Sequence, residues 1–321
     1  MSTRKNRQNR HLGKEKPAAK EQPVVASSAE YRVRQEAGMP AALPAEAMAR
    51  YVAIGDSFSE GLMDPGANGR FRGWTDRLAA KFSGIRTQAG LPETQYANLA
   101  IRGKLLAPII EEQLPRALEL EPTVVSLVGG GNDLLRPKST PDRLAALLES
   151  GVQQCLQAGA AVILCTSSNA ADGGLIEKTR GPNAILNSHI WSIARRYPNV
   201  FVIDQWGLAA LRTWPAWAAD RIHLTPTGHE VLSRGALNAL GWEFVPDHER
   251  TLGPGEVPIP TDVPVWQAVP EGWAETEPTW QDDLAWVRRD FLPWVGRHLR
   301  GRSSGDRISA KRPELLSISA Y

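Results

Sequence analysis

The sequence predicts an α/β protein built on a parallel sheet with helices on both of its faces. Segments with the composition of strands and segments with helical spacing alternate about five times between residues 49 and 242. One strand segment, 123–128, is continuous and rich in β-branched residues, which is typical of strands buried on both faces. A composition of 42% hydrophobic and 22% charged residues over 321 residues is sufficient for a sizeable core.

Five short apolar segments account for the predicted strands. The first covers 51–54 and leads directly into Gly55-Asp56-Ser57. The others cover 96–100, 123–128, 160–164 and 200–203. All have the length of ordinary strands, so we expect a five-stranded parallel sheet.

Five further segments have the spacing of helices. They cover 74–82, 105–118, 140–156, 182–196 and 226–240. Thr140 and Pro141 suit the N-cap and the first helical position, and they mark the start of the third helix. Pro108 falls in the first turn of the second helix, where proline is tolerated.

The chain outside residues 49–242 is predicted to contribute no part of this α/β domain. Residues 1–48 are predicted to be a disordered basic tail, because they begin with a polar, basic stretch that lacks the apolar segment of a secretory signal. A later translation start, at Met39 or Met48, is an open alternative. Residues 243–300 are predicted to form a strap rich in proline and tryptophan and an amphipathic helix, and 301–321 a disordered tail.

The helix predicted from residue 279 carries an apolar stripe. Its members are Trp280, Leu284, Val287, Phe291 and Trp294, with a kink expected at Pro293. We expect the stripe to pack on the α/β domain, with 246–278 as the strap that reaches there. A tryptophan-lined wall for an acyl group or a sugar, and a helix at a membrane surface, are the alternatives.

Charge and cysteine content narrow the class of protein. A formal net charge of +2 gives no general argument for a nucleic-acid partner. Two cysteines, Cys155 and Cys165, form neither a disulfide framework nor a zinc site, which fits a cytoplasmic chain. No segment is long and apolar enough to predict membrane insertion.

Polar residues gather where the predicted strands end. In open α/β sheets, ligands bind at the carboxyl ends of the strands. Ser57 follows the first strand, Gly103 the second and Asn132 the third, while Asp220 and His223 precede the last helix. We therefore expect these five residues to meet at one edge of the sheet.

These residue types suit nucleophilic catalysis. A serine hydroxyl needs an adjacent base, which His223 can provide, and Asp220, three residues earlier, can orient the imidazole ring. The backbone N–H groups of Ser57 and Gly103 and the side-chain amide of Asn132 can stabilise an oxyanion.

The four segments resemble the blocks of the SGNH hydrolase family, the GDSL-type esterases. Gly55-Asp56-Ser57, Gly103, Gly130 to Asp133, and Asp220 to His223 match the four blocks in order, over about 49–242. The resemblance implies a flavodoxin-like three-layer α/β/α sandwich, ester hydrolysis through an acyl-enzyme, and no metal or organic cofactor.

Two residues depart from the family pattern. Phe58 stands where many members have leucine, which should not affect the chemistry. Arg102 stands before Gly103 where a small residue is common. We expect its side chain to point to solvent; narrowing of the pocket and recognition of an anion are the alternatives.

Each block taken alone has an ordinary structural explanation. Ser57 could be a helix N-cap, the glycines at 129–131 a tight turn, and Asp133 a loop brace, with Asp56 supporting the turn. Their order and their places at strand ends favour catalysis. We predict a serine esterase acting on small-molecule acyl esters, with an acyltransferase, a thioesterase or a non-catalytic binding module as alternatives. The natural substrate and the oligomeric state stay open.

Overall fold

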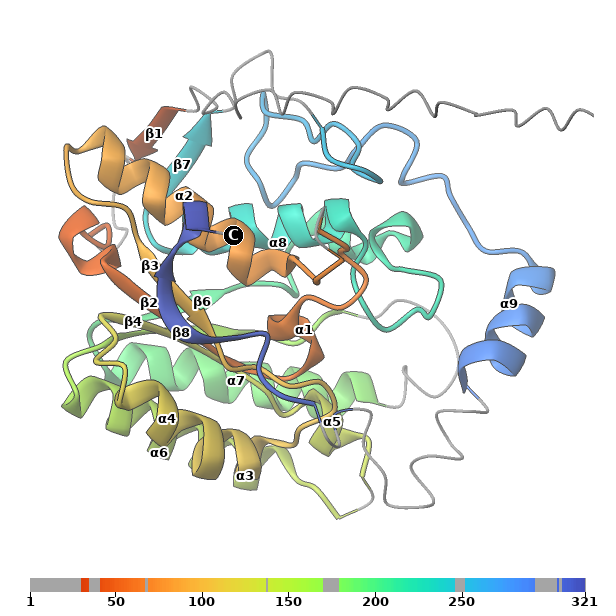
Figure 1. The fold of residues 1–321 in the computed structure, drawn as a ribbon. Helices are drawn as coiled ribbons and strands as arrows, with labels where there is room; N and C mark the ends of the chain where they lie inside the picture. The colour runs from red at the N-terminus through yellow and green to blue at the C-terminus, as the bar shows by residue number, and fades with distance from the viewer. Residues whose placement is uncertain are drawn as a thin grey trace, which may run out of the picture.

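The computed structural model of the chain describes residues 30–34, 41–66, 69–136, 138–169, 179–245, 252–291, 305 and 308–320. Its centre is a six-stranded sheet with the order β6-β5-β4-β2-β3-β8 (Figure 1). The parallel strands are β2 (Arg50–Gly55), β3 (Gln95–Asn98), β4 (Val124–Val128), β5 (Ala161–Cys165) and β6 (Val200–Ile203). They correspond to the five predicted strands.

Helices cover both faces of this sheet. On one face lie α2 (Gly73–Gln88) and α8 (Pro226–Ala239); on the other lie α4 (Leu114–Leu118), α6 (Pro141–Gln157) and α7 (Arg180–Arg196) (Figure 1). Successive side chains of β2 enter opposite cores, Tyr51 one and Val52 the other. The predicted three-layer α/β/α sandwich is confirmed.

The order of the strands determines where a ligand can bind. The chain passes from β2 outward to β3 and then returns past β2 to β4, β5 and β6. This is the flavodoxin-like order, and its switch point lies between β2 and β4. The segments that follow these two strands carry Ser57 and Asn132 respectively.

The predicted helix at 105–118 consists of three shorter pieces. α3 (Leu106–Pro108) leads into a π-helical turn (Ile109–Gln113), which leads into α4. Pro115, at the start of α4, has no N–H to continue an α-helical ladder, and this explains the break. The wider turn places Gln113 in the interior, where it is 5% exposed.

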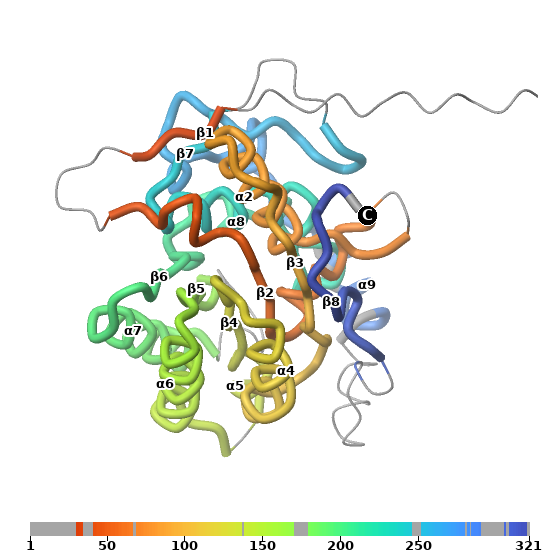
Figure 2. Tube along the Cα trace, turned by 60° about the vertical axis from the view of Figure 1, so that its left-hand side comes forward, coloured from red at the N-terminus to blue at the C-terminus, as the bar shows by residue number. Residues whose placement is uncertain are grey.

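The predictions of disorder at both ends of the chain are wrong for the described residues. β1 (Glu30–Val33) pairs with β7 (Trp242–Val245), and a 3₁₀ helix (Ala45–Met48) precedes β2. β8 (Arg312–Ser317) extends the sheet by one antiparallel strand beside β3 (Figure 2). Each of these segments finds its partners far away in the sequence, which local composition cannot indicate. Residues 1–29 lie outside the described residues.

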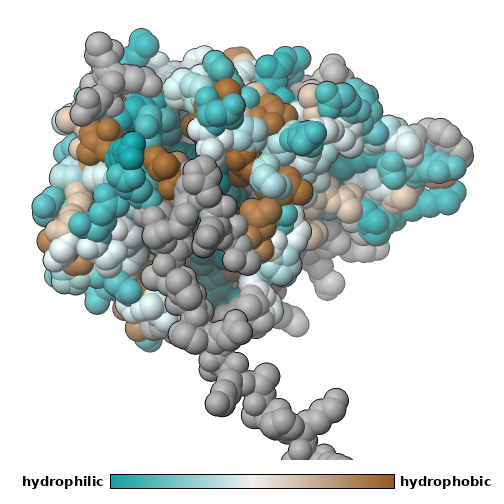
Figure 3. All heavy atoms as spheres, turned by 90° about the horizontal axis from the view of Figure 1, so that it is seen from above, coloured by the Kyte–Doolittle hydropathy of each residue, from teal (hydrophilic) through white to brown (hydrophobic). Residues whose placement is uncertain are grey.

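The C-terminal helix contacts the domain partly through a residue outside the predicted stripe. α9 (Trp280–Trp286) continues into a π-helical turn (Val287–Phe291), while Pro293 and Trp294 lie outside the described residues. Leu284, a member of the stripe, is 41% exposed. Trp286, which is not a member, is half-buried and bonds to the domain. α9 projects from the body of the molecule (Figure 3). Among the described helices, none has the length and apolar character needed to cross a membrane.

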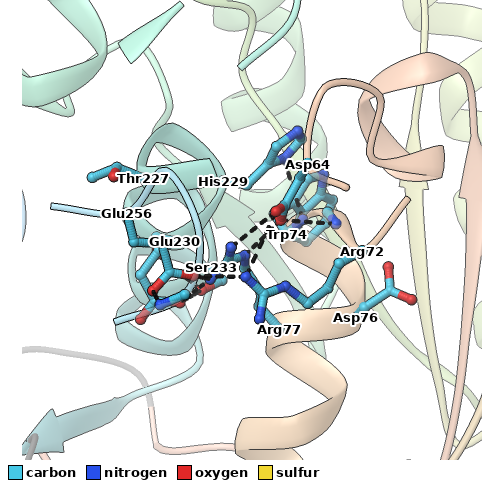
Figure 4. Close-up of polar contacts among 12 residues, drawn as sticks. Asp64, Arg72, Trp74, Asp76, Arg77, Thr227, His229, Glu230, Ser233 and Glu256 are labelled. Atoms are coloured by element: carbon cyan, nitrogen blue, oxygen red, sulfur yellow. Dashed lines mark hydrogen bonds and ion pairs between the residues drawn. The ribbon is translucent and has the colours of Figure 1, made fainter. Parts of the chain in front are cut away.

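A cluster of buried charges joins α2, α8 and the strap (Figure 4). Arg77 on α2 is its centre and pairs with Asp64 at 2.8 Å and with Glu256 at 2.7 Å. The Arg77 and Glu256 side chains are 3% and 2% exposed. The cluster contains the carboxylates of Asp64, Glu230 and Glu256 and the cations of Arg72, Arg77, Lys81 and Arg234. It fastens the strap to the two helices.

Removing the charge of Glu256 should destabilise the fold. In Glu256→Gln, two carboxylates would remain for four cations, and the loss of a hydrogen bond to a charged group typically costs about 1.5–3 kcal/mol. Urea unfolding at pH 7 should therefore give a lower free energy of unfolding. Glu271→Gln, which changes an exposed residue of the same segment, is the control. Equal stability of the two variants would contradict the role of the cluster.

Candidate active site

The serine predicted as the nucleophile lies on a single helical turn directly after β2. Asp56 is the N-cap of α1 (Ser57–Glu60), and its Oδ1 accepts a hydrogen bond from Phe58 N–H at 3.1 Å. Ser57 is therefore the first helical residue and not the cap. Gly61 ends the turn with φ 89°, and it packs against the backbone of Gly73 too closely for a side chain.

His223 and Asp220 complete a chain of hydrogen bonds from Ser57. His223 Nε2 lies 2.8 Å from Ser57 Oγ, and its Nδ1 lies 2.6 Å from Asp220 Oδ2. Asp220 Oδ1 accepts the backbone N–H groups of Ile222 and His223, both at 3.0 Å. This carboxylate holds the imidazole so that Nδ1 donates and Nε2 is free to accept the serine proton.

The environment of Asp220 favours its charged form. Burial alone raises the pKa of this carboxyl group, but the hydrogen bond from His223, the charge on that ring and two backbone donors outweigh burial and lower it below its usual value. Asp220 therefore stays ionised at neutral pH, as a group that orients a histidine must.

The residues predicted as oxyanion donors lie next to this chain. Gly103 follows β3 with φ 73°, a left-handed conformation that favours glycine. Asn132 lies on α5 (Gly131–Leu134) after β4, and its Nδ2 donates to Asp56 Oδ2 and to Lys104 O, both at 3.1 Å. Both amide hydrogens are engaged, so donation to an oxyanion requires Asn132 to exchange one of these bonds.

Sequence reasoning missed two residues that brace the site. Gln113 bonds both backbone groups of Gly55, accepting from N–H at 2.8 Å and donating to C=O at 3.0 Å. Glu60 accepts from Arg102 N–H at 2.8 Å. No motif marks either residue, because the partners are 58 and 42 positions apart in the chain.

The predicted orientation of Arg102 is wrong. Its guanidinium is ion-paired with Glu60 and lies over the ring of Phe71 at 5.2 Å, and its side chain is 23% exposed. The buried carboxylate of Glu60 attracts the cation inward, away from solvent. Arg102 therefore braces the loop of Gly103.

Other polar residues near the site have structural contacts. The carboxylate of Asp133 accepts from Leu106 N–H at 3.0 Å. His229 donates through Nε2 to Leu62 O at 2.9 Å, and burial lowers its pKa to about 4.

Among the described residues, the remaining histidine gives no sign of a second site. His189 faces Asp142 at the surface, while His248 and His298 lie outside the described residues. In the described parts of the chain, no three His, Cys, Asp or Glu side chains gather as a metal site requires.

Aromatic residues surround the histidine loop. The ring of Phe58 lies 6.1 Å from that of His223 and 6.2 Å from that of Trp217. Trp286 on α9 donates from Nε1 to the backbone carbonyl of Asp220 at 2.8 Å. The guanidinium of Arg221 lies between the rings of Trp214 and Trp286, at 5.1 and 5.3 Å. α9 thus contacts the loop that holds Asp220.

The fold and the Ser57–His223–Asp220 chain define a class: an α/β protein with the geometry of a serine hydrolase. A sequence profile of the GDSL-like lipase/acylhydrolase family matches residues 53–231. The chain belongs to this family and is an ester-hydrolysing enzyme. The alternative of a non-catalytic binding module is set aside accordingly. A comparison with curated proteins returned no match.

Solved structures with low identity share the fold. One is LAE5, an α/β hydrolase from the metagenome of Lake Arreo, Spain: TM-score 0.50, 21% identity, covering 60% of this chain and 95% of that one. Another is a variant of Axe2, an acetyl xylan esterase from Geobacillus stearothermophilus: TM-score 0.50, 22% identity, covering 62% of this chain and 97% of that one. At such identities the likeness concerns the fold alone.

The rate of ester hydrolysis should fall at acid pH because two groups become protonated, His223 and Asp56. His223 must be neutral to accept a proton. Burial raises the pKa of Asp56 to about 6, so protonation of this carboxyl begins well above its usual range and weakens the hydrogen bond that holds the Asn132 amide in position. Log(kcat/KM) should therefore approach a slope of about 2 as pH falls below about 6. In Asp56→Asn the slope should be about 1, with a lower plateau. Equal slopes in both proteins would contradict this role of Asp56.

Proposed function

We propose that Ser57, His223 and Asp220 form the catalytic triad of this esterase and that Ser57, Gly103 and Asn132 form its oxyanion hole. The observation that carries the proposal is the unbroken hydrogen-bond chain from Ser57 Oγ through the imidazole to the Asp220 carboxylate. A lone serine is a weak nucleophile, and this arrangement is the one that activates it.

The reaction then proceeds in two halves. Ser57 Oγ attacks the acyl carbon while His223 Nε2 takes its proton. His223 then gives that proton to the leaving alcohol as the carbon–oxygen bond breaks, which leaves an acyl-enzyme. A water molecule attacks the acyl carbon and loses a proton to His223, and the return of this proton to Ser57 releases the carboxylic acid. The oxyanion donors stabilise both tetrahedral intermediates.

The proposed substrates are small-molecule acyl esters, with no nucleic acid and no membrane insertion involved. An acyltransferase or thioesterase would use the same residues and differ in the acceptor and the leaving group. We place the enzyme in the cytoplasm, because Cys155 and Cys165 are both free and buried. Recovery of the native chain from another compartment on cell fractionation would overturn this assignment.

Replacement of the nucleophile should abolish turnover and leave the fold intact. We expect Ser57→Ala to hydrolyse p-nitrophenyl acetate roughly 10⁴-fold more slowly or worse, and to resist labelling by a fluorophosphonate probe. Ser59→Ala is a matched control, because Ser59 lies on the same helical turn and its buried hydroxyl has no hydrogen-bond partner among the described residues. Substantial turnover by folded Ser57→Ala would refute the mechanism.

A further inference from the structure

A lysine from the C-terminal end of the chain is held beside the helical turn of Ser57. Lys311 Nζ donates to the backbone carbonyl oxygens of Glu60 at 2.6 Å, Phe71 at 2.9 Å and Arg72 at 3.0 Å. It also pairs with the carboxylate of Asp76 at 2.6 Å, and its side chain is 13% exposed. Four acceptors for three N–H donors mean that the whole ammonium group bonds within the protein.

One of these acceptors belongs to the turn that carries the nucleophile. Glu60 is the last residue of α1, and the C-terminal carbonyl groups of a helix have no partner inside it. A helix of one turn is not stable by itself, so outside contacts determine its position. Lys311 supplies such a contact by tying Glu60 to the two residues that precede α2.

The side chain of Glu60 extends this connection to the second oxyanion segment. Its Oε2 accepts from Arg102 N–H at 2.8 Å, and its carboxylate also pairs with the Arg102 guanidinium. Arg102 directly precedes Gly103. A displacement of Glu60 would therefore move both the turn of Ser57 and the N–H of Gly103.

We propose that Lys311 is a positioning residue for ester hydrolysis, and that β8 thereby completes the active site. This inference rests on the proposed roles of Ser57 and Gly103. Lys311 touches neither substrate nor reacting atoms; it fixes the distance between the nucleophile and the oxyanion donors through Glu60. Lys311 and β8 both lie beyond residues 53–231, the region that the family profile matches.

Lys311 could instead have a purely structural role, and this differs from the positioning role in a testable way. Burial raises the pKa of Asp76, while the charge and hydrogen bond of Lys311 act against that rise. Lys311 would be purely structural if its only task were to neutralise this carboxylate. The two roles differ in what Asp76→Asn does to a Lys311 variant, because that substitution removes the charge and leaves the carbonyl groups unbound.

The experiment compares three variants of the full chain by kcat, KM and melting temperature. Lys311→Met should lower kcat roughly 10- to 100-fold with KM little changed, as small misplacements of reacting groups do. Lys311→Met/Asp76→Asn should regain melting temperature but not kcat. Arg312→Met is the matched control, because Arg312 directly follows Lys311, is a 3% exposed cation and donates to Leu316 O and Ser317 O. It should lose melting temperature and keep kcat.

Recovery of kcat in the double variant, or an equal loss of kcat in Arg312→Met, would overturn the inference. If Lys311→Met does not fold, the double variant takes its place, since it carries no uncompensated carboxylate. Amide hydrogen exchange at 57–61 and 101–104 gives a readout independent of turnover, and it should speed up in Lys311→Met and not in Arg312→Met. If the wild-type protein hydrolyses no ester, the proposed function fails, while unchanged exchange in Lys311→Met refutes the positioning role separately.

Discussion

The proposed active site depends on how one short piece of backbone, residues 55–61, is held at the end of β2. A single helical turn has too few internal hydrogen bonds to keep its own position. The protein supplies the missing contacts from separate elements: Gln113 on Gly55, Asn132 on Asp56, and Lys311 on Glu60. Ser57 Oγ consequently stands at a fixed 2.8 Å from the imidazole.

The pKa values of two carboxyl groups beside this turn are shifted in opposite directions for a clear reason. Asp220 and Asp56 are both buried, and burial alone disfavours the charge on each. Asp220 accepts two backbone N–H groups and the ring of His223, which outweigh burial, and its pKa falls. Asp56 accepts from Phe58 N–H and Asn132 Nδ2, which do not, and its pKa rises to about 6. Shallower burial and more donors lower the pKa of Asp220, whereas deeper burial and fewer donors raise that of Asp56.

Local sequence patterns predicted the parallel strands and the residues that meet at their carboxyl ends. Each strand is a short apolar segment, and side chains that follow strands must gather at one edge of a parallel sheet, so the positions of Ser57 and Asn132 follow from periodicity and topology. The orientation of the Arg102 side chain could not be predicted in this way, because it depends on the carboxylate of Glu60, 42 residues away. The pairing of β8 with β3 joins segments more than 200 residues apart and has no local signal.

Segments that follow the region matched by the family profile bond directly to residues of that region. Glu256 enters the ion cluster between α2 and α8, Trp286 bonds the backbone of Asp220, and Lys311 bonds that of Glu60. In the proposed mechanism, the last two contacts lie on the two sides of the proton transfer: one on the loop of Asp220, which orients His223, and one on the turn of Ser57. In this proposed mechanism, the matched region supplies the reacting groups, and these later segments constrain the separation between them. Sequence changes in the later segments should therefore alter the rate of the reaction and leave its chemical course unchanged.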